Sequence, residues 1–259
     1  MRRSIGHSLR IDASANAVRL QRVSRWRGDP LTLIAEQAIA PSAEHPFDAI
    51  ANALRALLGE QEFSGWPASI VLGGELTRMW RVTPPPGAAR LADMEAAAGL
   101  RFQALYGEAP SAWQVSADWS ATEPFFAAAV PRALLALLQL VAQEFKLSIV
   151  AMEPQFVAHW NRWRRGVKQG AWFGIVHDNL LTLGAIDSGG KDMRAIRVLP
   201  VPNGADHYWL TQTLKREALL LDMSAPELLQ VCGAPPEAWL QPAAHPEYIA
   251  CAALGGSAA

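Results

Sequence analysis

The sequence predicts an α/β protein of two lobes, each built around a mixed sheet with helices packed on it. Three short strands followed by a helix and a further strand occur from about residue 8, and the same order returns from about residue 171. A helix between two strands of one sheet is the usual crossover to a parallel strand. Between the two patterns lies the polar, glycine-flanked segment 166–170 (GVKQG), which is typical of a boundary. We therefore expect a first lobe at 1–166, with an inserted subdomain at about 75–124, and a smaller second lobe at 167–259.

The composition excludes several classes of protein. Hydrophobic residues make up 51% of the 259 residues and charged ones 18%, enough for a sizeable core and too little charge for a disordered chain. The net charge of −1 excludes binding to nucleic acid or to an anionic membrane by bulk charge. Two cysteines and six scattered histidines provide neither a disulfide framework nor a metal site. The chain start has no apolar signal core and the apolar stretch 125–145 is interrupted, so we expect a cytoplasmic protein without direct membrane insertion.

The first seventy residues combine strand and helix periodicity. Apolar residues alternate in 17–23, where Val18 and Leu20 are two positions apart, as in a strand with one buried face. A Gly28-Asp29-Pro30 turn precedes the third strand. Apolar residues at 47, 50, 54, 57 and 58 have helical spacing, and a short buried-type strand follows. We expect strands at 8–13, 17–23, 31–39 and 68–72 and a helix at 47–58.

The remainder of the first lobe contains the insert and a second crossover. Three consecutive prolines end a strand at 77–82, and an alanine-rich segment predicts a helix at 90–106. The run FFAAAV at 125–130 leads into a helix that begins at Pro131, because proline is favoured at the first helical position. In chain order we expect a strand at 112–119, a helix at 131–145, a strand at 147–152 and a helix at 155–165.

The second lobe repeats the opening meander. Strands at 171–177 and 180–187 are separated by a short polar turn, and a glycine-rich turn precedes a third strand at 193–201. A helix at 206–222 then returns the chain to a short strand at 228–231. We expect a final helix at 246–253.

A duplicated meander with a crossover is the plan of the actin-like fold, in which two ribonuclease-H-like domains carry mixed sheets with helices on both faces. Segment 11–23 (IDASANAVRLQRV) resembles the opening strand–turn–strand of the pilus-assembly protein PilM and its relatives. Segment 69–81 (SIVLGGELTRMWR), the helix at 90–106 and the run from Phe125 to Arg162 resemble the same group, which includes PilM-like and GspL-like cytoplasmic proteins. The resemblance covers about residues 8–201 and implies a member of the actin-like ATPase superfamily.

In nucleotide-binding members of this superfamily, two turns cradle phosphates with backbone N–H groups, and glycine allows the close approach. Here neither the first turn, 12–17, nor the second, 177–180, contains glycine. The adenine-cradling glycine pair is also poorly matched, by 232–234 and 254–256. These departures imply no catalytic residue, no cofactor and no ATPase activity, with an ATP- and Mg²⁺-binding member as the alternative. The degenerate nucleotide positions are Asp12, Ser14, Asn16, Asp178 and Asn179.

Two groups of residues could form a functional site or could have a purely structural role. A ribonuclease-H-like nuclease would hold Mg²⁺ between carboxylates, here Asp12 with Glu75, Glu153 or Asp178; otherwise Asp12 is a strand-end aspartate that turn amides satisfy. Segment 159–165 mixes aromatic and basic residues, as single-stranded nucleic acid sites do. Core packing with a basic helix end explains that segment without a ligand, and we favour this interpretation. We therefore expect neither a metal site nor a nucleic-acid partner.

The insert carries the candidate partner-binding residues. The resemblance implies that an inner-membrane protein segment, PilN-like, docks on this part of the first lobe, and aromatic residues anchor such interfaces. The candidates are Arg78, Trp80, Trp113 and Trp119, although each tryptophan is compatible with a place in the core. We thus expect a catalytically inactive bacterial adaptor for type IV pilus biogenesis or a related secretion system, a pseudo-ATPase held peripherally at the inner membrane through its partner.

Overall fold

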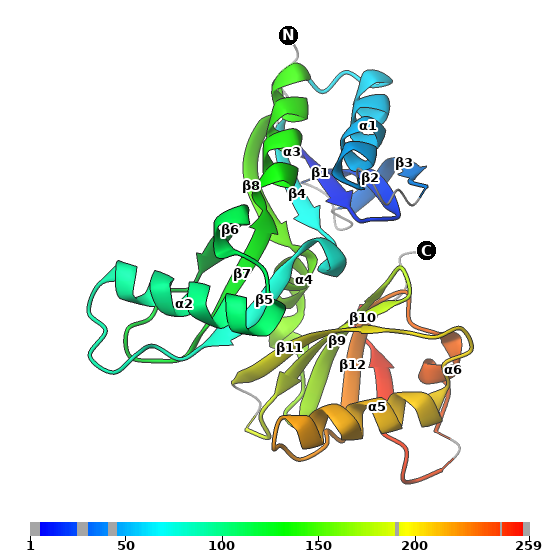
Figure 1. Ribbon diagram of the computed structural model, residues 1–259. Helices are drawn as coiled ribbons and strands as arrows, with labels where there is room; N and C mark the ends of the chain where they lie inside the picture. The colour runs from blue at the N-terminus through cyan, green and yellow to red at the C-terminus, as the bar shows by residue number, and fades with distance from the viewer. Residues whose placement is uncertain (1–5, 25–30, 41–45, 190–191, 244, 256–259) are drawn as a thin grey trace. The chain divides into compact units, whose positions relative to one another are not determined.

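The computed structural model describes residues 6–24, 31–40, 46–189, 192–243 and 245–255. Figure 1 shows their order along the chain. The described strands form two five-stranded sheets and one three-stranded sheet. The strands before residue 40 and those after residue 170 belong to different sheets, as the predicted duplication requires.

The first five-stranded sheet has the order β3-β2-β1-β4-β8. Strands β1, β2 and β3 pair antiparallel, whereas β4 runs parallel to β1 and β8 runs parallel to β4. This is the predicted meander followed by a crossover; the predicted turn at 28–30 lies outside the described residues. The strands are β1 (His7–Ala13), β2 (Ala17–Ser24), β3 (Leu31–Ala38), β4 (Pro67–Leu72) and β8 (Ser148–Pro154).

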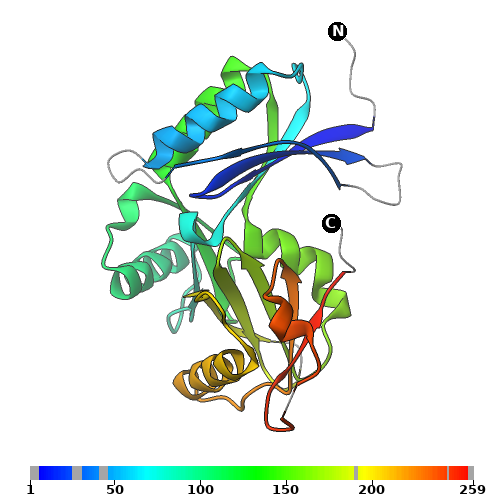
Figure 2. The same cartoon turned by 90° about the vertical axis from the view of Figure 1, so that its right-hand side faces the viewer.

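Helices α1 (Pro46–Gly59) and α3 (Arg132–Glu144) pack against each other over one face of this sheet, as Figure 2 shows. Their apolar positions recur every three or four residues, so each helix presents one stripe to the strands. Side chains such as Leu54 and Leu138 meet Leu9, Ile11 and Ile70 of the sheet in the core. Removing this much apolar surface from water is the main stabilising term for the unit.

Between β4 and α3 lies the insert, with strands β5 (Arg78–Val82), β6 (Trp113–Ala117) and β7 (Phe125–Pro131). The sheet order is β5-β7-β6, with β6 and β7 antiparallel. Helix α2 (Leu91–Tyr106) buries Met94, Ala98 and Phe102, one residue per turn, and ends at Gly107 in the left-handed conformation. Two 3-10 turns, η1 (Gly74–Leu76) and η2 (Pro110–Ala112), flank these elements.

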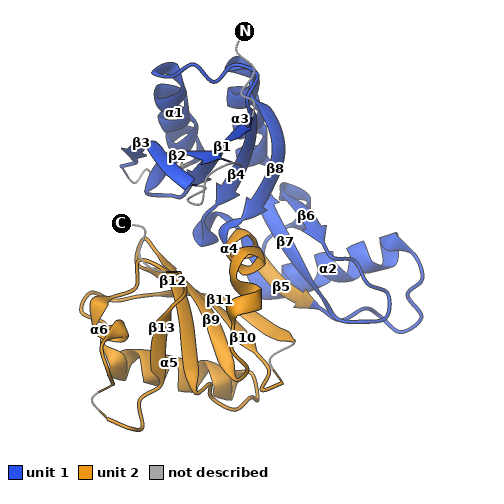
Figure 3. Cartoon of the chain, turned by 180° about the vertical axis from the view of Figure 1, so that it is seen from behind, with its two compact units in different colours: residues 1–78, 82–155 blue, residues 79–81, 156–259 orange. Residues whose placement is uncertain are grey.

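The second five-stranded sheet has the order β11-β10-β9-β12-β13 and repeats the strand directions of the first. Helix α5 (His207–Leu220) covers one face and α4 (Gln155–Trp163) the other, as Figures 1 and 3 show from opposite sides. The mixed sheets of the predicted fold class are therefore confirmed. The strands are β9 (Ala171–His177), β10 (Leu180–Ile186), β11 (Met193–Pro200), β12 (Leu228–Gly233) and β13 (Ala250–Ala253).

The chain divides into two compact units, Met1–Arg78 with Val82–Gln155, and Met79–Arg81 with Phe156–Ala259 (Figure 3). The division falls after Gln155, the first residue of α4, and thus earlier in the chain than the expected boundary at 166. The reason is packing: the rings of Phe156 and Trp160 on α4 meet Phe173 of β9 edge to face, at 5.6 and 5.5 Å between centroids. No helix among the residues described above has both the length and the apolar character to cross a membrane.

The expected helix at 246–253 is wrong, because residues 250–253 form strand β13, parallel to β12. A short apolar run such as ACAA does not distinguish helix from strand by periodicity. Strand pairing determines the conformation of this segment, since Cys251 lies opposite Leu229 on β12. The chain instead forms the short helix α6 (Glu237–Leu240), which the sequence pattern does not predict.

Candidate functional site

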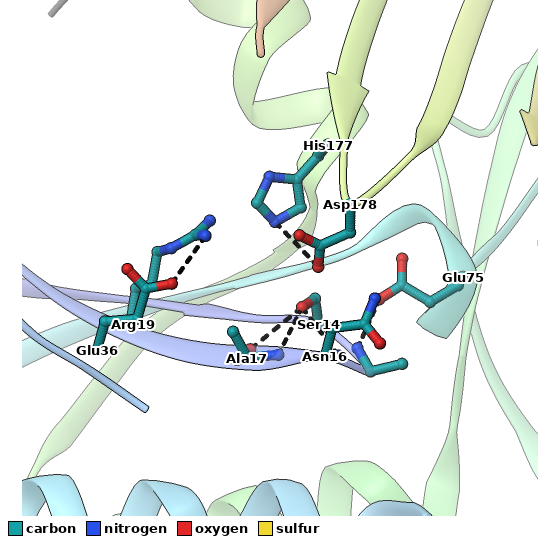
Figure 4. Close-up of polar contacts among 9 residues, drawn as sticks. Ser14, Asn16, Ala17, Arg19, Glu36, Glu75, His177 and Asp178 are labelled. Carbon is teal, nitrogen blue, oxygen red and sulfur yellow. Dashed lines mark hydrogen bonds and ion pairs between the residues drawn. The ribbon is translucent and has the colours of Figure 1, made fainter. Parts of the chain in front are cut away.

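The first turn, between β1 and β2, uses all four of its backbone N–H groups inside its own unit (Figure 4). Ser14 Oγ accepts from the N–H groups of Asn16 and Ala17, at 3.2 and 3.0 Å. The N–H of Ser14 donates to the carbonyl of Ala17 at 2.9 Å. The N–H of Ala15 donates to Glu75 Oε1 at 2.7 Å. A phosphate at this turn would therefore have to displace protein acceptors from the N–H groups.

Glu75 comes from η1, which directly follows β4. Because β4 runs parallel to β1, with Leu72 opposite Ala13, the two strands end at the same edge of the sheet. The carboxylate lies over Gly73, where an added Cβ would be 2.6 Å from Glu75 Oε1. Glycine at 73 thus makes room for the side chain that reaches the first turn.

Asp12 lies at the end of β1 and pairs with Arg10 on the same face of the strand, at 2.7 Å between Nε and Oδ1. Our expectation that turn amides satisfy this carboxylate is wrong, because the turn amides bond Ser14, Ala17 and Glu75 instead. On β8, burial raises the pKa of Glu153, and the Arg10 charge opposes the shift. Within the described ranges, no three His, Cys, Asp or Glu side chains gather as a metal site.

The second turn, between β9 and β10, is a two-residue hairpin loop. His177 and Leu180 pair across it, and Asp178 and Asn179 have φ values of 49° and 58°. Positive φ at both central positions is the type I′ geometry, which Asp and Asn tolerate without glycine. Inside this unit, His177 Nε2 lies 3.5 Å from Asp178 Oδ2 (Figure 4). Two of the predicted degenerate positions therefore build a tight hairpin.

The glycines at the positions expected for an adenine cradle have packing roles. Gly233 has a φ of 89°, and a Cβ there would lie 2.2 Å from the carbonyl oxygen of Val176 on β9. Gly255, with a φ of 82°, lies against the indole of Trp163, 2.7 Å from the place of a Cβ. Residue 256 lies outside the described residues. Both described glycines thus allow close contacts within the second unit.

In the insert, Arg78 and Trp113 form one contact cluster with residues at the end of α2. The Arg78 guanidinium lies 5.3 Å from the Trp113 ring and 5.6 Å from the Tyr106 ring, both cation–π distances. Glu108 contacts both residues, accepting from Trp113 Nε1 at 3.0 Å and lying 3.6 Å from Arg78 Nη2. The ring of Phe102 packs against that of Trp113, at 5.4 Å between centroids.

The structure brings together only two of the four predicted partner-binding residues. Trp80 is 3% exposed and Trp113 is 7% exposed, which favours the core interpretation for both indoles. Trp119 is half-buried and packs edge to face on Phe125, 5.5 Å between centroids. Arg78 keeps 31% of its side chain exposed and Glu108 keeps 40%. The accessible part of the cluster is therefore the Arg78–Glu108 pair, and the sequence pattern did not indicate Glu108 or Tyr106.

The aromatic and basic segment at the end of α4 packs within the second unit. Arg162 stacks over Trp163 at 5.1 Å, and Phe156 and Trp160 face the sheet. His159 Nδ1 lies 3.4 Å from Cys232 Sγ, and burial raises the pKa of that thiol to about 12. A thiol held in its neutral form is a poor nucleophile.

The second unit also contains a cavity of about 450 Å³ that no predicted site residue lines. It lies where β9 and β11 begin and β10 ends, away from the hairpin at Asp178 and Asn179. Trp172 and Met223 contribute apolar surface to its wall. Asp187, Arg194 and Glu227 contribute charges of both signs.

No protein-family model matches the chain, and no curated protein matches it either. Solved structures do. The cytoplasmic domain of EpsL, an inner membrane component of the type II secretion system of Vibrio cholerae, matches with a TM-score of 0.62 and 11% identity, over 96% of this chain and 90% of that domain. A chain of the PilM–PilN type IV pilus biogenesis complex matches with a TM-score of 0.58 and 16% identity, over 88% of this chain and 81% of its own.

A third similar structure is a Bacteroides thetaiotaomicron protein of unknown function with an actin-like ATPase fold. Its TM-score is 0.61 at 11% identity, over 90% of this chain and 84% of that one. At such identities the likeness concerns the fold, and it extends over both units of the chain. The similarity to PilM-like and GspL-like proteins indicated by segments 11–23 and 69–81 is thereby confirmed at the level of the fold: the chain has the actin-like ATPase fold.

Proposed function

We propose that this chain is a catalytically inactive actin-like adaptor that binds a segment of an inner-membrane protein in a type IV pilus or secretion machine. The observation that carries this proposal is the first turn, where Ser14, Ala17 and Glu75 take every N–H group that would otherwise face a phosphate. Phosphate recognition by a turn depends on such groups being directed at the ligand. Because we propose that the turn does not recognise phosphate, the role that we assign to the fold is to bind a protein partner.

The similar structures support the class of partner. One is the cytoplasmic domain of an inner membrane secretion component, and another is a complex named for pilus biogenesis. By analogy of fold, the chain would be held at the inner membrane through its partner. The proposed partner is the cytoplasmic segment of a PilN-like protein, and no nucleotide or metal takes part.

The insert supports the place of binding. Strand β6 is at the edge of its sheet in the order β5-β7-β6, and its residues Gln114 and Ser116 are exposed. An edge strand can accept an extended peptide through main-chain hydrogen bonds, while side chains beside it determine specificity. The half-exposed pair of Arg78 and Glu108 lies at the start of β6, next to Trp113. We propose that these two charged groups recognise side chains of the partner.

A two-step experiment tests the proposal. A photo-crosslinking amino acid at position 114 in the full chain, used in cells, should capture an inner-membrane protein, and the same residue at exposed position 62 should not. The cytoplasmic segment of the captured protein is then titrated against the purified chain. Saturable binding that weakens in Arg78→Ala supports the site. Equal crosslinking from both positions, or binding unaffected by any folded variant of the insert, contradicts it.

A further inference from the structure

Helix α5 of the second unit combines basic and apolar side chains on its outer face. Figure 1 shows this helix lying across the second sheet at the surface of the unit. Its inner face is buried against the unit, and none of the side chains exposed on the other face is acidic, although the whole chain has a net charge of −1. The exposed side chains are Tyr208, Gln212, Lys215, Arg216, Leu219 and Leu220.

The last turns of this face hold two leucines beside two cations. Leu219 is 81% exposed, more than any other large hydrophobic side chain in the described part of the chain, and Leu220 is 69% exposed. Leu219 follows Lys215 by four residues, and Leu220 follows Arg216 by four, so each leucine is the helical neighbour of a cation. We call these four residues the α5 tip. Nearly all the apolar surface of its leucines remains available for withdrawal from water.

The α5 tip has a positive surface because the acidic residue within it is buried and paired twice. The side chain of Glu217 is 4% exposed and lies 3.1 Å from Arg216 Nη2 and 3.8 Å from Nε of Arg197 on β11. The two arginine side chains stay 61% and 46% exposed. Lys215 adds a third cation, and Asp222, exposed in the turn after the helix, opposes one of the three. Three cations and two carboxylates leave one excess positive charge.

An anionic lipid surface complements this arrangement. Helices that lie on membranes place cations among the headgroups and insert leucine or aromatic side chains at the boundary with the acyl chains. Tyr208, 57% exposed, lies eleven residues before Leu219, about three turns, and so on the same side of the helix. Tyrosine is enriched at membrane–water interfaces. A bilayer surface accepts projecting side chains without a preformed pocket, whereas a protein partner has to match their shape.

We infer that the outer face of α5 docks the second unit on the surface of a membrane that contains anionic phospholipids, with the α5 tip as the inserted part. The helix lies along the lipid surface and does not span it. This inference goes beyond the proposed function, in which a protein segment binds the insert, because it assigns a direct lipid contact to a different unit. The local charge of the α5 tip drives the contact, not the net charge of the chain.

The lipid contact is weak and reversible. Each surface cation contributes about fivefold to partition onto an anionic leaflet, and each leucine largely withdrawn from water contributes about tenfold. With one excess charge and two leucines, the expected affinity is below that of a single myristoyl chain, which itself binds membranes marginally. Binding should therefore be detectable at millimolar lipid.

Sedimentation of the purified full chain with large unilamellar vesicles tests the inference. The vesicles contain phosphatidylcholine alone or phosphatidylcholine mixed with phosphatidylglycerol. We expect the bound fraction to rise with the content of phosphatidylglycerol and to fall as salt screens the charges. The double variant Leu219→Ser/Leu220→Ser should lower the partition coefficient at least about tenfold, and Lys215→Gln/Arg216→Gln about tenfold.

A matched control comes from α2, where an exposed leucine also adjoins an exposed arginine. Leu100 is 71% exposed and Arg101 is exposed beside it. Leu100→Ser/Arg101→Gln should bind vesicles as the wild type does. The melting temperature of every variant is measured first. Should Lys215→Gln/Arg216→Gln fail to fold, Lys215→Gln alone replaces it: a loss of about fivefold is expected, and an unchanged partition coefficient refutes the role of charge.

Four results would overturn the inference. Absence of binding to phosphatidylglycerol vesicles at millimolar lipid removes the lipid contact. Equal binding by wild type and both α5 variants places the contact on another face. Equal binding to phosphatidylcholine alone, unaffected by salt, contradicts recognition of anionic headgroups. A concentration-dependent dimer that Leu219→Ser/Leu220→Ser abolishes while vesicle binding persists assigns the face to a second copy of the chain.

This experiment contains the chain and lipid but no partner protein. Its failure would leave the adaptor proposal to the crosslinking and titration described above. Conversely, an insert that binds no membrane protein would leave the lipid contact of α5 unaffected.

Discussion

Substitution of Arg78 tests the proposed binding site in the insert more directly than substitution of any tryptophan there. Its guanidinium stacks on Tyr106 and Trp113, at 5.6 and 5.3 Å, and lies 3.6 Å from a carboxylate oxygen of Glu108. One of its N–H groups also donates to the carbonyl of Glu75 at 3.2 Å. Substitution with alanine removes these contacts but opens no cavity in the core, because 31% of the side chain is already exposed.

The stability cost of Arg78→Ala follows from the contacts it removes. Two cation–π contacts at an exposed site contribute about 0.5–1 kcal/mol each, and an exposed ion pair contributes about 0–1 kcal/mol. The expected loss is therefore about 1–3 kcal/mol, or roughly 2–12 °C in melting temperature for a chain of this size. Trp113→Ala would instead cost about 3–5 kcal/mol, because that indole is 7% exposed and its removal leaves a cavity.

The assay measures melting temperature and partner affinity on the same proteins. The matched control is Arg55→Ala: Arg55 is 34% exposed and pairs with Glu144 at 2.8 Å in the same unit, but it lies on α1 outside the insert. For Arg78→Ala we expect a loss of about 2 kcal/mol in binding, about 30-fold in Kd, as for an interface arginine. For Arg55→Ala we expect unchanged affinity. Equal affinities of wild type and both variants would refute the assignment of Arg78 to the interface.

Three further predictions concern the rest of the chain. Gly233→Ala should destabilise the second unit by more than about 1 kcal/mol in denaturant unfolding, because its φ is 89° and the new Cβ would lie 2.2 Å from the Val176 carbonyl oxygen; a stability equal to wild type would contradict this. The raised pKa of Glu153 means that the folded state binds the proton more tightly, so this residue's contribution to stability falls as pH rises from the unfolded value, about 4.3, through the raised one. Glu153→Gln should therefore raise the melting temperature at pH 7 and have little effect at pH 3, whereas an equal effect at both pH values would be inconsistent with burial as the cause. The thiols of Cys232 and Cys251, whose pKa values burial raises to about 12, should react slowly with a thiol reagent at pH 8 until the chain is denatured; rapid native labelling would show that the thiols are accessible.

The fold could be predicted from the sequence because both meanders have clear periodicity. Alternation identifies strands such as 17–23, and spacing of three and four identifies the helix at 47–58, so the repeated order of elements indicates two similar sheets. The fifth strand of the second sheet was missed, since 250–253 is short and uniformly apolar. The sequence pattern also does not predict to which unit α4 belongs. The packing of Phe156 and Trp160 on Phe173 determines this.

The candidate site was only partly accessible to sequence reasoning. The lack of glycine in both turns was evident, but the partner of the first turn was not, because Ala15 and Glu75 are 60 residues apart. A signal did exist: β1 and β4 are consecutive parallel strands of the predicted crossover, so the residues after each must meet at one sheet edge. Considering Gly73, Gly74 and Glu75 in that position would have placed a carboxylate beside the first turn.

In the insert, the sequence indicated Arg78 and Trp113 but not what joins them. Their contact depends on Tyr106 at the end of α2 and on Glu108, which follows the left-handed residue Gly107. A turn of this kind reverses the direction of the chain, and its consequences for distant side chains appear only in three dimensions. Burial of Trp80 was equally hidden, since its strand pattern is shared by exposed and buried edge strands.

The central claim is that this chain uses an actin-like fold without a nucleotide, and thermal melting with Mg-ATP tests it most directly. A ligand that binds only the folded state stabilises it by about 2.7 kcal/mol at a concentration one hundred times its Kd, which is readily visible as a shift in Tm. The closed first turn predicts the same Tm with and without millimolar Mg-ATP, beyond the change given by MgCl₂ and salt of equal ionic strength. A Tm that rises and saturates with Mg-ATP, and that no longer rises in Asp12→Ala, would contradict the account.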